Sequence, residues 1–152
     1  MTNLNDTIEP FEIDTDQGKC YSKDHAGKNL VLFFFPKADT TGCTKEATSF
    51  SDLINEFENL NTIVIGISKD TVEKQAKFRS KYDLKCILGS DVDIKFCSKF
   101  GVWVEKSMYG RKYMGIQRST FLINTEQKIQ HIWNKVKVPG HAEEVLEVVK
   151  QL

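Results

Sequence analysis

The segment at residues 29–35 (NLVLFFF) constrains the fold more than any other part of the sequence, because it contains an unbroken apolar run of six residues from Leu30 to Phe35. A short apolar run that is rich in aromatic residues is typical of a strand buried on both faces inside a sheet. Pro36 ends the run. A membrane-spanning helix needs about 20 apolar residues. We therefore expect an internal strand and no membrane segment.

The residues that follow alternate between helix and strand patterns. Apolar residues recur at three- and four-residue spacing over 44–60, which predicts one amphipathic helix. Residues 62–67 (TIVIGI) predict a second buried strand. Asp70, with Glu73 three residues later, predicts the start of a helix that runs to about residue 82. The first half of the chain therefore has the order strand, helix, strand, helix.

The second half of the chain predicts shorter elements, and ends in an antiparallel hairpin and a helix. They are a strand at 86–88, a helix at 91–100, a polar loop at 105–115, paired strands at 119–123 and 129–136, and a helix at 141–152. No linker, repeat or low-complexity tract interrupts the order, so we expect one domain over residues 1–152. The pattern predicts an α/β fold with a mixed central sheet and helices on both faces. A thioredoxin-like fold fits it, and a flavodoxin-like order stays open on pattern alone.

Charge and cysteine spacing exclude several classes of function. Lys plus Arg and Asp plus Glu both number 21, so no bulk charge attracts nucleic acid or an anionic membrane. The four cysteines (Cys20, Cys43, Cys86 and Cys97) form no C-x-x-C pair, and the three histidines (His25, His131 and His141) are scattered, so we expect no metal site. Residues 1–6 carry no readable secretory signal, which makes a reducing cytosol the expected location.

Cys43 is the strongest candidate for a reactive residue. It follows Phe35 by eight residues and stands at the start of the longest predicted helix. Free N–H groups and the positive end of the helix dipole stabilise a thiolate at such a position. Thr40 stands three residues earlier, so its hydroxyl can reach the same pocket. Most free cysteines are small buried hydrophobes, so the residues alone leave a structural role for Cys43 open.

The segment at residues 33–50 (FFFPKADTTGCTKEATSF) resembles the active-site segment of peroxiredoxins, in which Pro, Thr and Cys are matched here by Pro36, Thr40 and Cys43. The form Gly-Cys-Thr-Lys-Glu resembles the bacterioferritin comigratory protein branch, also called PrxQ. Three later segments extend the resemblance to the C-terminal region, at residues 106–110, 115–123 and 135–142.

The resemblance implies a thioredoxin fold and a thiol peroxidase that uses neither metal nor organic cofactor. Such an enzyme reduces hydrogen peroxide and organic hydroperoxides, acts in antioxidant defence and redox homeostasis, and is regenerated by a thiol. The resemblance also implies that the Cys43 thiolate attacks the peroxide and that Arg118 positions the peroxide. It also implies that Thr40 orients sulfur and peroxide, and that Pro36 shields the pocket. Without the resemblance, Arg118 has the pattern of an ordinary surface cation.

The second thiol of the cycle is where the sequence departs from the family pattern. Many members carry a resolving cysteine at the position of Thr48, and others near Arg79, and neither position is a cysteine here. Cys97 is the best internal alternative, although its neighbours Phe96 and Phe100 favour a core role. We therefore expect resolution by an external thiol such as glutathione, thioredoxin or glutaredoxin. A monomer is the simplest expectation for the assembly.

Three other classes of protein compete with a peroxidase. A thioredoxin-fold redox sensor or binding module, in which Cys43 is oxidised without turnover, is the main alternative. A cysteine hydrolase would need a histidine base, and the sequence pairs none with Cys43. A disulfide oxidoreductase would need a cysteine at position 46, which is Glu46.

Overall fold

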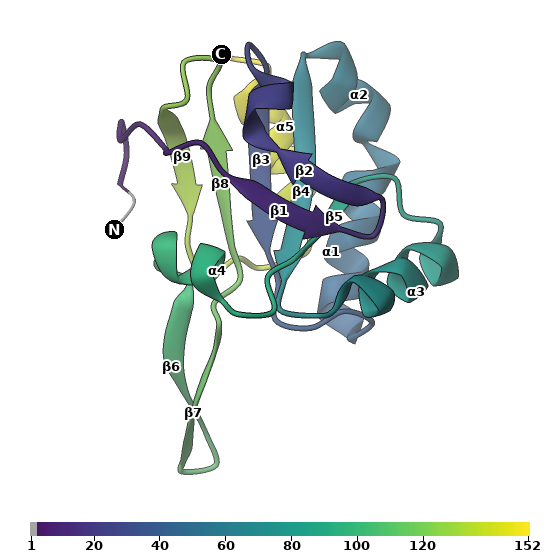
Figure 1. Cartoon of the computed structure of the whole chain (residues 1–152), viewed down its shortest axis with the longest axis vertical. Coiled ribbons are helices and arrows are strands. Elements are labelled where there is room, and N and C mark those ends of the chain that lie inside the picture. The colour runs from purple at the N-terminus through teal and green to yellow at the C-terminus, as the bar shows by residue number, and fades with distance from the viewer. Residues whose placement is uncertain (1–2) are drawn as a thin grey trace.

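The computed structural model describes residues 3–152 and contains a seven-stranded mixed sheet with the strand order β2-β1-β5-β4-β3-β8-β9 (Figure 1). The strands are β1 (Glu12–Thr15), β2 (Gly18–Tyr21), β3 (Asn29–Phe34), β4 (Thr62–Ser68), β5 (Ile87–Ser90), β8 (Ser119–Ile123) and β9 (Ile129–Trp133). Strand β3 pairs in parallel with β4 and antiparallel with β8, and all of its residues are buried. The apolar run therefore forms the internal strand that the sequence predicted.

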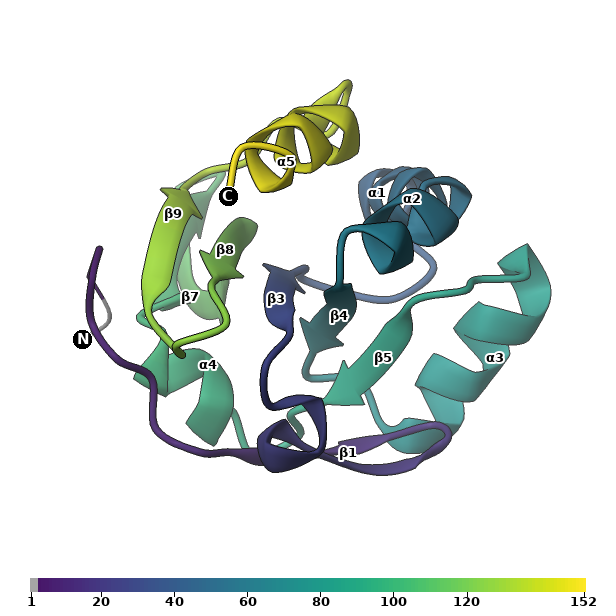
Figure 2. The same ribbon diagram turned by 90° about the horizontal axis from the view of Figure 1, so that it is seen from above.

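Two hydrophobic cores lie on opposite faces of this sheet, because alternate residues of β3 point to opposite sides. Val31 and Phe33 belong to the first core, whereas Leu32 and Phe34 belong to the second. Helices α1 (Thr41–Asp52), α2 (Ile54–Asn59) and α5 (His141–Val149) cover the first face, and α4 (Lys95–Lys99) lies on the other (Figure 2). Helix α3 (Val72–Tyr82) lies beside β5, and a short 3-10 helix (Ser22–His25) follows β2. The predicted mixed sheet with helices on both faces is confirmed.

Two predictions about the elements are wrong. The single helix expected at 44–60 is divided into α1 and α2, because Leu53 leaves helical geometry (φ −100°, ψ 7°). The loop expected at 105–115 is a hairpin of β6 (Trp103–Met108) and β7 (Arg111–Ile116), which projects from the body of the molecule (Figure 1). Its turn residues Tyr109 and Gly110 both have positive φ, the geometry of a tight hairpin turn.

Several boundaries also differ from the predicted ones. The helix expected at 91–100 begins only at Lys95, because Ile94 is left-handed (φ 56°) and the Asp91 carboxylate accepts from the backbone N–H groups of Phe96 and Cys97. Strand β9 and helix α5 stop short of the residues predicted for their ends, 136 and 152. The β1–β2 hairpin was not predicted.

No helix within residues 3–152 is long and apolar enough to cross a membrane. The N-terminal stretch from which a cytosolic location was expected includes residues 1–2, which lie outside the described part of the chain.

Candidate active site

The loop that carries the chain from β3 to α1 is fixed by contacts with its neighbours. The Phe35 N–H donates to the carbonyl oxygen of Ile67 over 2.9 Å, which extends the pairing with β4 by one residue. The Ala38 N–H donates to the Asp70 carboxylate over 2.7 Å. Asp39, which has a positive φ of 64°, binds the side chains that end α3. The start of α1 is therefore held against β4 and α3.

Cys43 is the third residue of α1, and only 1% of it is exposed. Thr40 is the N-cap residue, and its carbonyl oxygen accepts the first helical hydrogen bond from the Thr44 N–H over 2.9 Å. The first turn of α1 contains no acidic residue. The thiol therefore lies at the positive end of the helix, where unpaired N–H groups favour an anion.

Arg118 reaches Cys43 from a distant part of the sequence because of the register of the sheet. It immediately precedes β8, in which Ser119 pairs with Phe34 at the end of β3. Its Nη2 donates to the Cys43 Sγ over 3.3 Å. A Cβ atom at Gly42 would lie 3.2 Å from the same nitrogen, so glycine gives the guanidinium room beside the helix.

Thr40 and Pro36 lie in the loop that precedes Cys43. The Thr40 hydroxyl donates to the carbonyl oxygen of Lys37 over 2.8 Å, so the lone pairs of its oxygen remain able to accept a hydrogen bond. Pro36 is partly buried at the end of β3. Among the four residues predicted for the site, the structure shows a direct side-chain contact between Cys43 and Arg118.

Glu46 is a residue of this site that the sequence analysis missed. Its Oε1 accepts from Arg118 Nη1 over 2.6 Å, and only 1% of its side chain is exposed. Burial raises the pKa of Glu46 to about 7, against the opposing effect of the Arg118 charge. Its position offered a signal, because a charged residue beside Ala47 and Phe50 on a buried helix face needs a partner.

Lys106 of β6 contributes a second cation. Burial and the Arg118 charge lower the pKa of Lys106, whereas its interaction with Cys43 opposes them. The histidines have other partners. His25 contacts Cys20, and the ring of His141 forms a hydrogen bond with the Thr120 hydroxyl over 2.7 Å. Within residues 3–152, no hydrogen bond joins a histidine to Cys43.

The other cysteines do not touch Cys43. Cys97 lies in the second core, so the sheet separates it from Cys43, which lies in the first. Cys86 shares the first core, but it lies near Ser51 at the far end of α1, with 3.7 Å between the Ser51 Oγ and the Cys86 Sγ. Burial raises the pKa of Cys86 to about 11 and also raises that of Cys97. Both thiols are protonated and inaccessible in this conformation.

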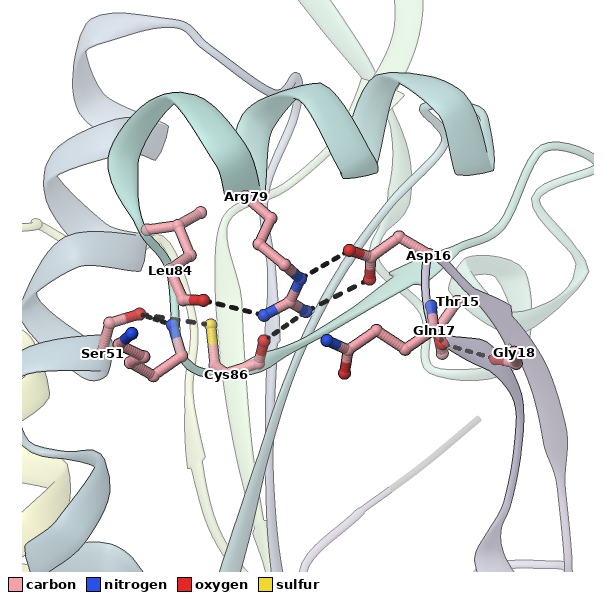
Figure 3. A network of polar contacts seen from close by, with 9 residues as sticks. Thr15, Asp16, Gln17, Gly18, Ser51, Arg79, Leu84 and Cys86 are labelled. Carbon is pink, nitrogen blue, oxygen red and sulfur yellow. Dashed lines mark hydrogen bonds and ion pairs between the residues drawn. The ribbon is translucent and has the colours of Figure 1, made fainter.

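Arg79, near which the sequence resemblance implied a possible resolving cysteine, fills a structural role (Figure 3). Its guanidinium binds the carboxylate of Asp16 and donates to the carbonyl oxygens of Leu84 and Cys86, both over 2.8 Å. These bonds join the end of α3 to residues 84–86, which lead into β5, and to the turn after β1. The segment that contains Cys86 is therefore held by Arg79 of α3 and by Ser51 at the end of α1.

Comparison with known proteins decides the family. The model of the AhpC/TSA family matches residues 4–132. The chain belongs to this family. A putative peroxiredoxin bcp of Coxiella burnetii is 46% identical over 137 residues, which cover 90% of this chain and 91% of that protein. The peroxiredoxin Bcp of Bacillus subtilis is 42% identical over 143 residues, which cover 93% of this chain and 91% of that protein.

Solved structures of peroxiredoxins share the fold. A Xylella fastidiosa PrxQ variant matches with a TM-score of 0.93 and 38% identity, over 99% of this chain and 97% of that chain. The bacterioferritin comigratory protein of Xanthomonas campestris was studied for its alkyl peroxide reduction activity. Its structure matches with a TM-score of 0.89 and 36% identity, over 96% of this chain and 98% of that chain. The thioredoxin-like fold is thereby confirmed, and the chain is a thiol-dependent peroxidase of the Bcp or PrxQ branch.

The buried carboxyl group of Glu46 predicts a pH-dependent effect on stability. Its pKa is about 7 in the folded chain, against 4.5 for an ordinary glutamate. Its contribution to stability is therefore complete below about pH 4.5 and is lost as the pH rises through about 7. Glu46→Gln removes this dependence. We expect the free energy of unfolding of wild type, minus that of the variant, to be roughly 1 to 3 kcal/mol lower at high pH than at low pH.

Chemical unfolding of both proteins at about pH 5 and about pH 8 measures this difference. His141 acts with the opposite sign, because burial lowers its pKa to about 4, but it is present in both proteins and its effect cancels. A difference that does not change with pH would contradict the buried environment of Glu46.

Proposed function

We propose that Cys43 is the peroxide-reducing thiol of this enzyme. The observation that carries this proposal is the contact of its sulfur with Arg118 at the start of α1. The thiolate attacks the terminal oxygen of the peroxide in line with the O–O bond. The S–O bond forms as the O–O bond breaks, so that Cys43 becomes a sulfenic acid and the other oxygen leaves as an alcohol or water after taking up a proton.

Three residues assist the attack. Arg118 positions the peroxide and stabilises the negative charge that moves from sulfur to oxygen. The Thr40 hydroxyl oxygen accepts a hydrogen bond from the peroxide O–H, because its own O–H donates to the carbonyl oxygen of Lys37. Pro36 covers the end of β3 and keeps bulk water from the thiolate. Both hydrogen peroxide and organic hydroperoxides present the same O–O–H group to these residues.

The setting of the enzyme is also a proposal. We place it in the cytoplasm as a monomer, without nucleic acid or membrane partners. All four cysteines are unpaired in the fold, which suits a reducing compartment. The net charge of zero supports the absence of a polyanionic partner.

The direct test of the function is Cys43→Ser, a nearly isosteric change that removes the nucleophile. We expect the variant to fold normally and to lose thiol-dependent peroxide consumption. Cys20→Ser is the matched control, and its first oxidative step should stay close to that of wild type. Sustained turnover by wild type distinguishes an enzyme from a sensor, which would stop after one equivalent of peroxide. Equal turnover by Cys43→Ser would refute the assignment.

Removal of the Arg118 charge should slow the chemistry and leave the fold in place. Loss of one preorganised donor to a developing charge costs about 2 to 4 kcal/mol, so Arg118→Ala should react with peroxide roughly a hundred to a thousand times more slowly. The thiolate fraction, read from ultraviolet absorbance, should also fall. Arg111→Ala on the projecting hairpin is the control. A rate within about threefold of wild type would show that Arg118 does not act on the peroxide.

The position of the other cysteines supports resolution by an external thiol. A disulfide needs α-carbons within about 7 Å. Cys97 would have to cross from the second core, and Cys86 is held by Arg79 and the end of α1. We infer that glutathione, a thioredoxin or a glutaredoxin attacks the Cys43 sulfenic acid, and that a mixed disulfide forms with loss of water.

Peroxide treatment without added thiol tests this inference, with non-reducing peptide mapping as the measurement. Wild type should accumulate sulfenic acid on Cys43 and no internal disulfide. Cys97→Ser and Cys86→Ser should each keep turnover with an external thiol. A stoichiometric disulfide from Cys43 to either residue, with turnover lost in the matching variant, would show that the chain resolves itself.

A further inference from the structure

Glu46 is in an unusual state for a carboxyl group that faces an arginine. Arg118 occupies one oxygen, Oε1, over 2.6 Å. The other, Oε2, is buried and has no hydrogen-bond partner within residues 3–152. An ionised carboxylate with one bare oxygen in the protein interior is costly, whereas a protonated one carries less charge and gains a donor. The surroundings of Glu46 therefore favour a bound proton.

Arg118 is the charged group that acts directly on Glu46, and the other titratable groups of the site act on Arg118. Cys43 lies three residues earlier on α1, and Arg118, just before β8, binds both side chains through its two terminal nitrogens. Lys106 on β6 interacts with Arg118 and with Cys43. His141 on α5 interacts with Arg118, and its pKa of about 4 leaves it neutral near pH 7. Within residues 3–152, Glu46 and Cys43 are the two acidic side chains that accept hydrogen bonds from Arg118.

We propose that Glu46 holds a proton in the resting enzyme and donates it to the oxygen that leaves the peroxide. The proposal rests on the assignment of Cys43 as the attacking thiol. In the resting site Cys43 is the thiolate and Glu46 the carboxylic acid. As the S–O bond forms and the O–O bond breaks, the leaving oxygen departs with the electron pair of the O–O bond. The Glu46 proton moves to that oxygen, directly or through one water molecule, and yields water or an alcohol.

The charges of the site stay balanced in this scheme. Before the attack Cys43 carries the negative charge, and after it Glu46 does, while Arg118 remains bonded to both side chains. A general acid works best when its pKa lies near the working pH, and burial places the pKa of Glu46 at about 7. The proton is recovered from solvent after a thiol has regenerated Cys43.

The test compares peroxides whose leaving groups differ in their need for a proton. Hydrogen peroxide and tert-butyl hydroperoxide would otherwise expel hydroxide or alkoxide, whereas peracetic acid expels a stable carboxylate. Glu46→Gln keeps the size of the side chain and an oxygen for Arg118, but cannot give up a proton. We expect it to slow Cys43 oxidation by hydrogen peroxide and tert-butyl hydroperoxide at least about tenfold, and by peracetic acid less than about threefold.

Glu144→Gln is the matched control, because it removes a glutamate that binds Trp133 on the outer side of α5. It should slow all three peroxides by less than about threefold. If Glu46→Gln slows all three equally, Glu46 only positions Arg118 and the proposal is wrong. If wild-type Cys43 reacts with none of them, the assignment of Cys43 itself fails, which is a separate result.

A second measurement uses wild type alone and does not depend on the folding of the variant. The rate with hydrogen peroxide, divided by the measured thiolate fraction, should decrease as the pH rises from about 6 to about 8, because Glu46 loses its proton. In Glu46→Gln this decrease should be absent. A wild-type rate per thiolate that stays constant over this range would overturn the proposal.

Discussion

The guanidinium of Arg118 is the interaction on which the site depends. Its two terminal nitrogens bind the sulfur of Cys43 and the carboxyl group of Glu46, two side chains one turn apart on α1. A forked cation suits this arrangement, because a lysine ammonium could not present two fixed donors in one plane. The bridge gives the helix start a second source of positive charge in addition to its free N–H groups, and it does so in a place where water is largely excluded.

The sheet explains how residues so far apart in sequence reach this bridge. Antiparallel pairing of β3 with β8 places Ser119 opposite Phe34, so the residue before β8 lies at the point where β3 releases the chain. The alternation of β3 side chains then divides the interior into two cores. Cys43 falls in one and Cys97 in the other. The same strand that builds the site thereby separates Cys43 from Cys97, the best internal alternative for a second thiol.

The strong local patterns could be predicted from the sequence, but contacts across the sheet could not. The apolar run of β3 and the helix-start signal at residues 70–73 sufficed to find β3 and α3, and the position of Cys43 after β3 indicated a reactive thiol. The break at Leu53 was missed because the apolar spacing continues through Leu53 and Ile54 although the backbone does not stay helical there. The β6–β7 hairpin was missed because most of its residues are exposed and show no alternation of apolar and polar residues. The role of Glu46 was missed because it depends on a partner, Arg118, that lies 72 residues away.

The central claim is that Cys43 is the thiol that takes oxygen from a peroxide. Intact-protein mass spectrometry after one equivalent of hydrogen peroxide, followed by peptide mapping, measures this directly. The account predicts the addition of one oxygen atom, located on Cys43, while Cys20, Cys86 and Cys97 remain unmodified. Oxidation that is spread over the four cysteines, or concentrated on any residue other than Cys43, would contradict it.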